Sequence, residues 1–404
     1  MNSFNALETL NSGKTFGKSL LGKKVKKTNE ELKQEKKKLE RMAGFMFLNV
    51  VLPIGFIYKR IKITIVWPLQ VIRIFSESFL RRNKSRCSLI INGAEYSLRS
   101  VLGLEFFRNK KVVLYLREKK PITDFTDMFS GCENLKKIKF TSTRNELVTS
   151  TENMFMGCKN LQKIALRNFD TCSVVRMSCM FKFCKNLKSV DSNFNTRFVN
   201  DMAGMFSWCE SLRQIDLSTF NTENTENFNG MFAYCSNLES LDLHFFNMER
   251  AYSTARMFMG CEKLESLDLS SFNTRVCARM NSMFEDCTGL KYINLEGLNT
   301  SSLEMASNMF KNCHSLADLD VSGFNMKEVA SMDEIFSGCW QLTKIDITSW
   351  HYQSCKTIEE MFKDCFSLVE VRGLKYPAGC NSDNIIDGAS ALIQICEIIP
   401  IGLN

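Results

Sequence analysis

The stretch MFEDCTGLKYINLEGLNTSSLEMASN, residues 283–308, decides the fold. It is one copy of a repeating unit, because cysteines recur every 26 residues, with a single step of 25. The ten cysteines of the series are Cys132, Cys158, Cys184, Cys209, Cys235, Cys261, Cys287, Cys313, Cys339 and Cys365. A period of about 20–29 residues with leucines at L-x-x-L-x-L spacing is typical of leucine-rich-repeat solenoids. No unit of such a fold buries its apolar face alone, so stacking makes the core.

Each unit also repeats its apolar residues around the cysteine. A phenylalanine precedes each cysteine by three positions, and a leucine follows it by three. The spacing of Phe284, Cys287 and Leu290 matches one helical face and predicts a short helix or 3₁₀ turn. A strand is expected next, because Ile293 and Leu295 share one face of an extended chain. The predicted fold is therefore an α/β repeat solenoid of leucine-rich-repeat type, with about ten units of 26 residues.

A Phe-Asn-Thr corner joins each strand to the next unit, as in Phe220-Asn221-Thr222 and Phe272-Asn273-Thr274. The asparagine is expected to bond the backbone of its own turn. The whole unit, Met-Phe-x-x-Cys-x-x-Leu-x-x-Ile/Leu-Asp-Leu-x-x-Phe-Asn-Thr, resembles the repeat of the BspA-like leucine-rich-repeat surface proteins over about residues 122–372. This resemblance implies a non-enzymatic surface or adhesion protein that contacts other proteins.

The cysteine column has two chemical interpretations. In-register units place equivalent residues about 4.7–4.9 Å apart, within the Cα separation that a disulfide accepts, so five cross-repeat bridges are conceivable. The favoured interpretation is a small apolar thiol that fills one layer of the core, between a phenylalanine and a leucine. The three histidines, His244, His314 and His351, lie near no pair of cysteines. We therefore predict neither a metal site nor a cofactor.

An acidic column is the candidate binding site. Between the inward Ile and Leu of the strand, a position that faces away from the core is aspartate in six units. These residues are Asp191, Asp216, Asp242, Asp268, Asp320 and Asp346. Stacked carboxylates at strand spacing repel by about 1 kcal/mol per pair in a high dielectric, so something must offset the repulsion. One interpretation is local bonding to Ser or Thr two positions on, such as Ser218, Ser270 and Ser322. The other is an acidic strip that binds a basic protein partner or, alternatively, Ca²⁺.

The net charge of +8 conceals a strong division along the chain. Residues 1–120 hold 26 Lys and Arg against 9 Asp and Glu, whereas the remaining 284 residues hold 26 against 35. In the polar, lysine-rich start, a capping box from Thr28 to Glu31 predicts the beginning of a helix. Residues 23–86 are expected to meet an anionic membrane surface. Nucleic-acid binding is disfavoured, because the arm lacks interleaved aromatic residues and a reader motif.

Residues 42–58, MAGFMFLNVVLPIGFIY, carry no charge and have basic neighbours on both sides. Their length reaches the lower limit for a helix that spans a bilayer. Three alternatives stay open: a membrane anchor over 42–58, a hairpin or interfacial element over 42–75, and an ordinary buried subdomain. The stretch IKITIV, residues 61–66, alternates like a strand. The protein is predicted to be membrane-associated, with the side of the membrane that carries the repeats left open.

The predicted organisation has five parts: a basic polar arm (1–41), a membrane-associated segment (42–86), an N-terminal cap (87–121), the repeats (122–372) and a C-terminal cap (373–404). The first cap is expected to hold a hairpin around Asn92-Gly93 and a strand over residues 111–116. No catalytic triad, metal set or phosphate loop is found in the sequence. The predicted function is a non-enzymatic protein-interaction or adhesion scaffold. A soluble intracellular scaffold with a lipid- or nucleic-acid-binding arm is a further alternative.

Overall fold

We analysed a computed structural model of the 404-residue chain. It describes residues 48–52, 62–66, 72–91, 93–103, 111–140, 147–167, 169–351, 353–392, 394–396 and 399–401. The chain divides into two compact units, Met1–Phe45 and Met46–Asn404, and all described residues belong to the second. The basic arm predicted over 1–41, with its helix start, lies outside the described residues.

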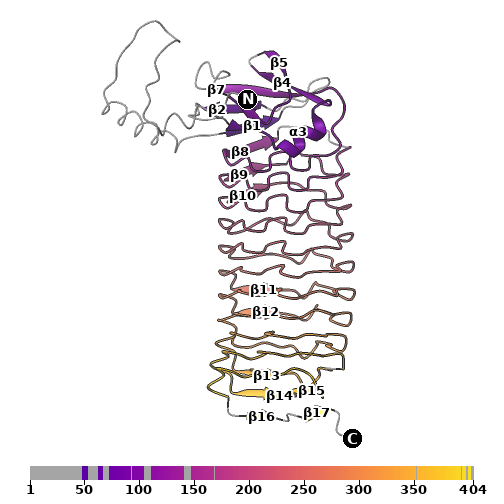
Figure 1. The fold of residues 1–404 in the computed structure, drawn as a ribbon, viewed down its shortest axis with the longest axis vertical. Helices are drawn as coiled ribbons and strands as arrows, with labels where there is room; N and C mark the ends of the chain where they lie inside the picture. The colour runs from indigo at the N-terminus through magenta and orange to yellow at the C-terminus, as the bar shows by residue number, and fades with distance from the viewer. Residues whose placement is uncertain are drawn as a thin grey trace, which may run out of the picture. The chain divides into compact units, whose positions relative to one another are not determined.

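The repeats form a stack of coils, each in register with the next (Figure 1). We number these coils 1 to 10 by their cysteines, from Cys132 to Cys365. Parallel backbone bridges join equivalent positions of successive coils, from Asp124 and Ser150 to Thr357 and Asn381. Short strands recur at one position of the coil: β8 (Leu135–Phe140), β9 (Lys163–Ala165), β10 (Ser189–Asp191), β11 (Ser266–Asp268), β12 (Tyr292–Asn294), β13 (Lys344–Asp346) and β14 (Glu370–Arg372). The result is a repeat fold of short parallel strands.

The Met-Phe-x-x-Cys segments are turns, and the short helices that their spacing allowed are not formed. In coil 5 the amide of Cys235 donates to the carbonyl of Phe232, three residues back, at 3.1 Å. The amide of Phe232 instead donates to the carbonyl of Met257 in coil 6, at 2.9 Å. Local and inter-coil bonds alternate in this way, whereas an α-helix directs its interior amides to its own carbonyls. Helix α3 (Glu77–Asn83) is the one helix in the part of the chain that the structure describes.

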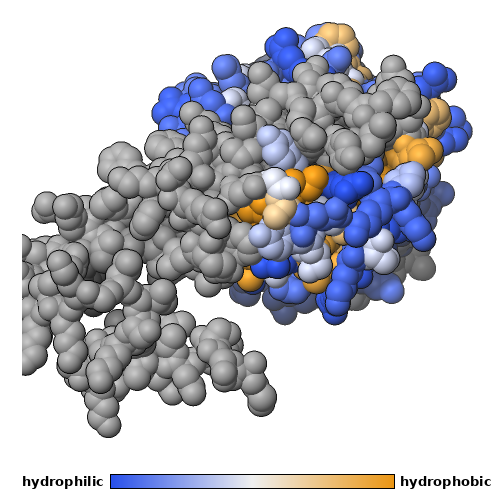
Figure 2. All heavy atoms as spheres, turned by 90° about the horizontal axis from the view of Figure 1, so that it is seen from above, coloured by the Kyte–Doolittle hydropathy of each residue, from blue (hydrophilic) through white to orange (hydrophobic). Residues whose placement is uncertain are grey.

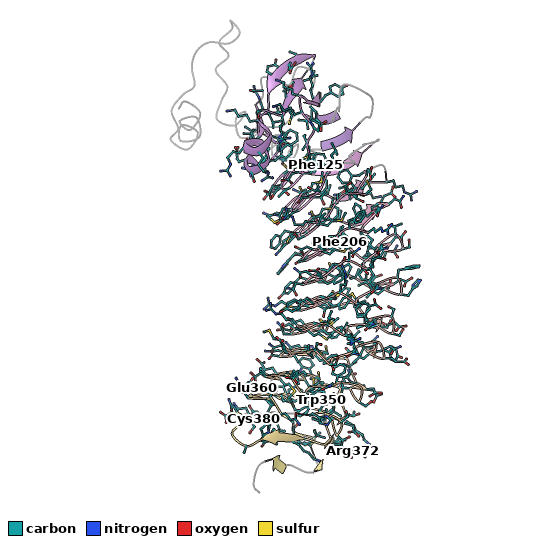
Figure 3. The ribbon with its side chains drawn as sticks, turned by 90° about the vertical axis from the view of Figure 1, so that its right-hand side faces the viewer. Phe125, Phe206, Trp350, Glu360, Arg372 and Cys380 are labelled. Atoms are coloured by element: carbon teal, nitrogen blue, oxygen red, sulfur yellow. The ribbon has the colours of Figure 1, made fainter. Side chains whose placement is uncertain are left out.

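Side chains lie in successive parallel layers along the stack (Figure 3), and the repeated phenylalanines and cysteines form two of its buried columns. The buried phenylalanine rings of neighbouring coils lie 5.2–6.1 Å apart between centroids and nearly parallel. From coil 2 onward, each cysteine thiol donates to the phenylalanine carbonyl of the preceding coil, at 3.1–3.3 Å. The ten repeat cysteines are free thiols, as the packing interpretation predicted. Burial raises the pKa of Cys235 to about 12, so this thiol stays protonated and able to donate.

A mixed sheet covers the N-terminal end of the stack. Strand β1 (Leu48–Leu52) pairs in parallel with β8 and antiparallel with β2 (Lys62–Val66). The sheet continues through β7 (Lys111–Glu118), β4 (Cys87–Ile91) and β5 (Ala94–Ser97), and a separate pair is formed by β3 (Ile72–Arg73) and β6 (Val101–Leu102). The predicted hairpin and the predicted strand from residue 111 are therefore both present. Figure 2 looks onto this end, where hydrophilic residues surround a few hydrophobic ones.

Helix α3 and the residue Phe75 that precedes it place apolar side chains at the head of the phenylalanine column. It begins after Ser76, whose hydroxyl accepts a hydrogen bond from the amide of Phe79 at 3.0 Å. Phe75 stacks on Phe129 of coil 1, with 5.7 Å between ring centroids. The first coil thus finds an aromatic neighbour on the side where no coil precedes it.

The described part of the apolar stretch 42–58 is a strand, β1, and not a membrane helix. Its pairing with β2 and β8 places it in the sheet of the first coils. Residues 42–47 and 53–58 lie outside the described residues. Across the described ranges, no helix has the length and apolar character needed to cross a bilayer.

The predicted C-terminal cap continues the repeat as an eleventh coil, which lacks a cysteine at the repeat position. Strand β16 (Gln394–Cys396) pairs in register with β14. The amide of Phe362 donates to the carbonyl of Ile385 at 2.8 Å, the same bond that Phe232 makes to the methionine of the next coil. A second parallel pair joins β15 (Lys375–Pro377) and β17 (Ile399–Ile401). Ala389 stands where the other coils have cysteine.

Candidate interaction face

The predicted aspartates lie on the exposed outer face of the stack, one in each of six coils. In five of them, one carboxylate oxygen accepts the backbone amide two residues on, at 2.9–3.2 Å. These bonds join Asp216 to Ser218, Asp242 to His244, Asp268 to Ser270, Asp320 to Ser322 and Asp346 to Thr348. Each bond closes the turn by which the chain leaves the strand. The predicted bonding to Ser or Thr is found at four of these positions, whereas at Asp242 the donor is His244.

The same bonds keep the carboxylates ionised. The hydroxyl of Ser218 and then its amide lower the pKa of Asp216, and the corresponding groups of Thr348 lower the pKa of Asp346. A hydrogen bond to the charged form of a carboxyl stabilises that form. The face therefore carries fixed negative charge at neutral pH, and the local bonds offset the repulsion between neighbouring coils.

In two coils the column position differs from this pattern, either in its residue or in its bonding. Asn294 occupies it in coil 7, where its side-chain oxygen accepts the amide of Glu296 at 3.1 Å. A neutral amide thus makes the same turn as a carboxylate. Asp191 of coil 3 instead forms an ion pair with Arg167 of coil 2. The corner after Asp191 reaches its phenylalanine, Phe194, one residue early, and this accounts for the single 25-residue step.

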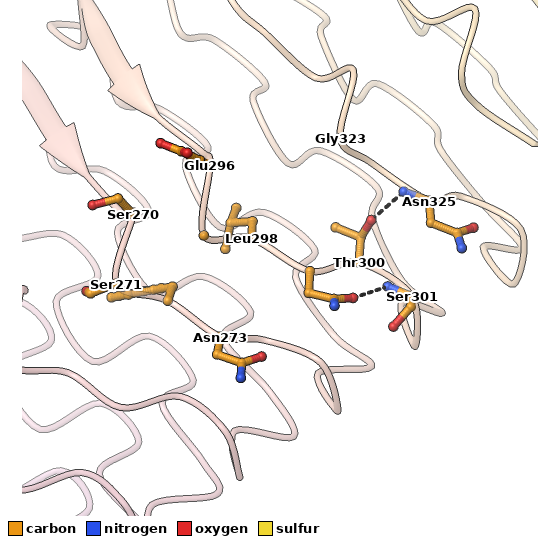
Figure 4. A pocket seen from close by; sticks show the side chains of 12 residues that line it. Ser270, Ser271, Asn273, Glu296, Leu298, Thr300, Ser301, Gly323 and Asn325 are labelled. Atoms are coloured by element: carbon orange, nitrogen blue, oxygen red, sulfur yellow. Dashed lines mark hydrogen bonds between the residues drawn. The ribbon is translucent and has the colours of Figure 1, made fainter.

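A hollow of about 540 Å³ opens beside this column, at the corners of coils 6 to 8 (Figure 4). Hydroxyl, amide and carboxylate groups form most of its lining, including those of Asn273, Glu296 and Ser301. The hollow adjoins the acidic column, because the amides of two lining residues, Ser270 and Glu296, donate to Asp268 and Asn294. Such a surface suits a partner that offers hydrogen-bond donors.

Two glycines shape the hollow in different ways. A Cβ atom on Gly297 would lie 2.4 Å from the carbonyl oxygen of Leu269, so no side chain fits there. A Cβ atom on Gly323 would meet no atom within 4 Å. Coil 5 carries Phe245 at the equivalent position, where its ring is 48% exposed. Coils 6 to 8 have the small residues Ser271, Gly297 and Gly323 at the position where coil 5 has this ring, and this leaves space for the hollow.

The Phe-Asn-Thr corners give the face a rigid frame. The side-chain oxygen of Asn299 accepts the amide of Ser301 at 3.0 Å, which is the predicted bond within the turn. The threonine makes a contact that the sequence pattern did not indicate. The hydroxyl of Thr274 donates to the carbonyl of Asn299 and accepts its amide, both at 2.9 Å. Each such threonine locks its corner to the corner of the next coil.

A second outward edge runs along the residues that immediately precede the cysteines. All ten have a left-handed backbone, which costs residues other than glycine about 1–2 kcal/mol. Seven are of the types that tolerate it best: Gly131, Gly157, Gly260, Asp286, Asn312, Gly338 and Asp364. Coils 3 to 5 instead hold Phe183, Trp208 and Tyr234, at φ of 62°, 63° and 59°. Stacking contributes about 0.5–1.5 kcal/mol per aromatic pair and offsets only part of this cost.

The exposed carboxylates of the column can accept hydrogen bonds from groups outside the chain. Each aspartate of the column belongs to a different coil, and in the described ranges no group of three or more His, Cys, Asp or Glu is placed to hold a metal ion. Exposed carboxylates and amides accept hydrogen bonds from ammonium and guanidinium groups. The alternative of a Ca²⁺ site therefore gains no support from the geometry of the column.

Comparison with known proteins places the repeats in a family. The family model described as "Mycoplasma protein of unknown function, DUF285" matches residues 123–241, 184–293 and 278–375, which together exceed half of the chain. The chain belongs to the DUF285 family. The matched residues of this DUF285 protein are those of the coils, whereas its resemblance to BspA-like surface proteins stays a prediction.

Two further comparisons concern other proteins. A comparison with curated proteins gives no match. Among solved structures, a chain of the crystal structure of the TLR13–ssRNA13 complex is 16% identical, with a TM-score of 0.21. The similarity covers 63% of the DUF285 chain and 38% of that chain. The DUF285 protein thus spans well under half the length of this neighbour.

Proposed function

We propose that this DUF285 protein is a non-enzymatic scaffold of the leucine-rich-repeat solenoid type, which binds a basic partner protein along its acidic column. The observation that supports the proposal most is the state of the aspartates. Five exposed carboxylates are held ionised, one per coil, by bonds from the backbone amides of their own turns. The hollow beside the column adds hydroxyl, amide and carboxylate groups that a partner could also contact.

The partner that fits has several Lys or Arg side chains in reach of successive coils. A single exposed ion pair contributes only about 0.2–1 kcal/mol, so one basic group would not give a useful affinity. Several carboxylates at a spacing of about 4.7–4.9 Å contribute together. Electrostatic complementarity of this kind also speeds association and selects between partners.

The test removes charge without changing the turns. In the triple variant Asp216→Asn, Asp242→Asn and Asp268→Asn, each asparagine can make the turn that Asn294 makes in coil 7. Binding of a fluorescein-labelled oligolysine peptide is measured by fluorescence anisotropy. Three pairs of about 0.2–1 kcal/mol correspond to an affinity loss of roughly three- to 150-fold.

The matched control neutralises carboxylates outside the column, in the double variant Glu223→Gln and Glu249→Gln. Both glutamates are exposed and follow the asparagines of their corners. The control is expected to bind the peptide like the unmodified chain. Equal affinities of the triple variant and the control would show that the column is not the binding site.

Membrane association through residues 23–86 is a separate proposal, supported by the excess of Lys and Arg in this part of the sequence. Flotation of the full chain with vesicles of phosphatidylserine and phosphatidylcholine tests it. The chain is expected to float with the vesicles at low salt and to be released at high salt. A chain that stays at the bottom of the gradient at low salt contradicts the proposal.

A further inference from the structure

Two cysteines outside the repeat column face each other near the C-terminal end of the stack. The sulfur atoms of Cys355 and Cys380 lie 3.8 Å apart. The two residues occupy equivalent positions of successive coils, since each precedes a residue of one in-register pair: the amide of Asn381 donates to the carbonyl of Lys356 at 2.9 Å. Equivalent residues of such coils lie about 4.7–4.9 Å apart, within the Cα separation that a disulfide accepts.

This pair combines a neighbouring thiol with access from solvent. Cys355 is 5% exposed, and Cys380 is half-buried. The ten repeat cysteines also follow one another from coil to coil, but they are fully buried and donate to phenylalanine carbonyls. Cys277 stands at the position of Cys355 in coil 6, where its equivalents in the adjacent coils are Ala251 and Leu303. Neither situation brings together two thiols of which one is accessible.

The surface beside Cys380 is open to a small molecule. The two residues before it, Ala378 and Gly379, are exposed. A Cβ atom on Gly379 would meet no atom within 4 Å. A disulfide reagent of the size of a short peptide can therefore approach Cys380, whereas the surrounding side chains shield Cys355.

We propose that Cys355 and Cys380 form a redox modification site, at which a small disulfide such as oxidised glutathione converts the two thiols into a disulfide between coils. The thiolate of Cys380 attacks one sulfur of the small disulfide, whose S–S bond breaks and releases one thiol. The thiolate of Cys355 then attacks the sulfur of Cys380, and the second small thiol leaves. The two released thiols carry the two protons, so two protein thiols are oxidised and one small disulfide is reduced.

The order of the two steps follows from the different surroundings of the thiols. The thiolate is the attacking form of cysteine. Burial raises the pKa of Cys355 to about 12. Burial also raises the pKa of Cys380, but the hydrogen bond with Cys355 counteracts this, while the carboxylate of Asp333 adds to it. Cys380 is thus both the more accessible thiol and the one that reacts first.

The disulfide would close a loop of 25 residues that contains strand β14 and the whole of coil 10. Each coil contacts only its neighbours, so the coils near an end of a stack open more readily than interior ones. A covalent link restricts the opened chain and thereby disfavours opening. Oxidation is therefore expected to stabilise the C-terminal coils locally. The proposal does not depend on the function proposed for the acidic column, because it uses other residues and another chemistry.

Oxidation of the full chain with oxidised glutathione tests the proposal. The reduced protein is incubated with the reagent, quenched with acid, alkylated in denaturant and analysed by peptide mass spectrometry. The main product is expected to be a peptide pair linked through Cys355 and Cys380, which dithiothreitol separates again. The repeat cysteines should remain alkylated. Cys179, a half-buried thiol of coil 3, is the internal reference and should carry at most a glutathione adduct.

Two variants distinguish the roles of the thiols. Cys355→Val introduces the residue that coil 8 has at this position, Val329, so the stack is expected to fold. In this variant Cys380 should accumulate a stable glutathione adduct, because no second thiol displaces it. In Cys380→Ser, Cys355 should stay unmodified, because the reagent cannot reach it. A melting curve for each variant verifies the fold.

Hydrogen exchange measures the structural effect. The amide of Phe362, which donates to Ile385 of the eleventh coil, should exchange about tenfold or more slowly in the oxidised chain than in the reduced one. The difference should be absent in Cys355→Val. A lasting glutathione adduct on Cys380 of the unmodified chain, disulfides to other cysteines in equal yield, or no reaction at Cys380 would each overturn the proposal. Equal exchange of the oxidised and reduced chains would overturn the stabilising role of the disulfide.

Discussion

Replacing Phe232 with alanine is expected to lower the free energy of unfolding by about 3–5 kcal/mol. The ring is fully buried and lies 5.7 Å from the ring of Phe206 and 6.1 Å from that of Phe258, nearly parallel to both. The cavity left by the substitution cannot close easily, because its two walls are rings that belong to other coils and are fixed by their own contacts. Since each coil contacts only its neighbours, the loss falls on the two interfaces of coil 5.

Urea unfolding followed by circular dichroism measures the effect, with Phe245→Ala as the matched control in the same coil. Phe245 is 48% exposed, so its loss is expected to change the free energy of unfolding by less than about 0.5 kcal/mol. For Phe232→Ala the midpoint should fall, and the slope should fall as well if the stack separates into two halves. A loss below about 1 kcal/mol, or equal effects of the two substitutions, would refute the argument that the phenylalanine column is the packed core.

Three further predictions concern the two glycines of the hollow, an aspartate of the acidic column, and the pH dependence of the stability. Gly297→Ala should destabilise the fold measurably in urea, because its Cβ would collide with the Leu269 carbonyl, whereas Gly323→Ala should have little effect. Asp268→Asn should change the melting temperature only slightly, because a neutral amide can make this turn. Thermal stability should also fall as the pH rises from about 8.5 towards 12. The unfolded Cys235 thiol ionises near 8.5, whereas burial raises its folded pKa to about 12, so its contribution is complete below 8.5 and is lost above it. A melting temperature that is flat between pH 8 and pH 11 would contradict this.

Much of the repeat was predictable, because the position of each cysteine locates the strand and the corner that follow it in the same coil. The cysteine period located the coils, the inward Ile and Leu located strands such as β12, and the Asn of the corner indicated its bond within the turn. The hairpin of β4 and β5 followed from Asn92-Gly93. In each case the residues of one short stretch determine its local structure, so it could be predicted without knowledge of the contacts with the neighbouring coil.

Features that depend on contacts between coils were not predictable in the same way. A spacing of three residues is common to a helix and to successive turns, and only the bonds from one coil to the next distinguish them. The pairing of β1 with β8 could not be predicted from the apolar run around β1, because β8 belongs to the first coil and is distant in the sequence. The left-handed edge had a signal that was missed, namely Gly, Asp or Asn before seven of the ten cysteines. The eleventh coil was not predicted as a repeat, because Ala389 replaces the cysteine at the repeat position.

The thiol-to-carbonyl bonds have a consequence for the length of the protein. Each cysteine contacts the coil before it, and each corner threonine contacts the coil after it, so interior coils are nearly interchangeable as neighbours. Excision of one full period, such as residues 236–261, would join equivalent points and leave every type of bond intact. A chain of this design can grow or shrink by whole layers while both of its ends stay as they are.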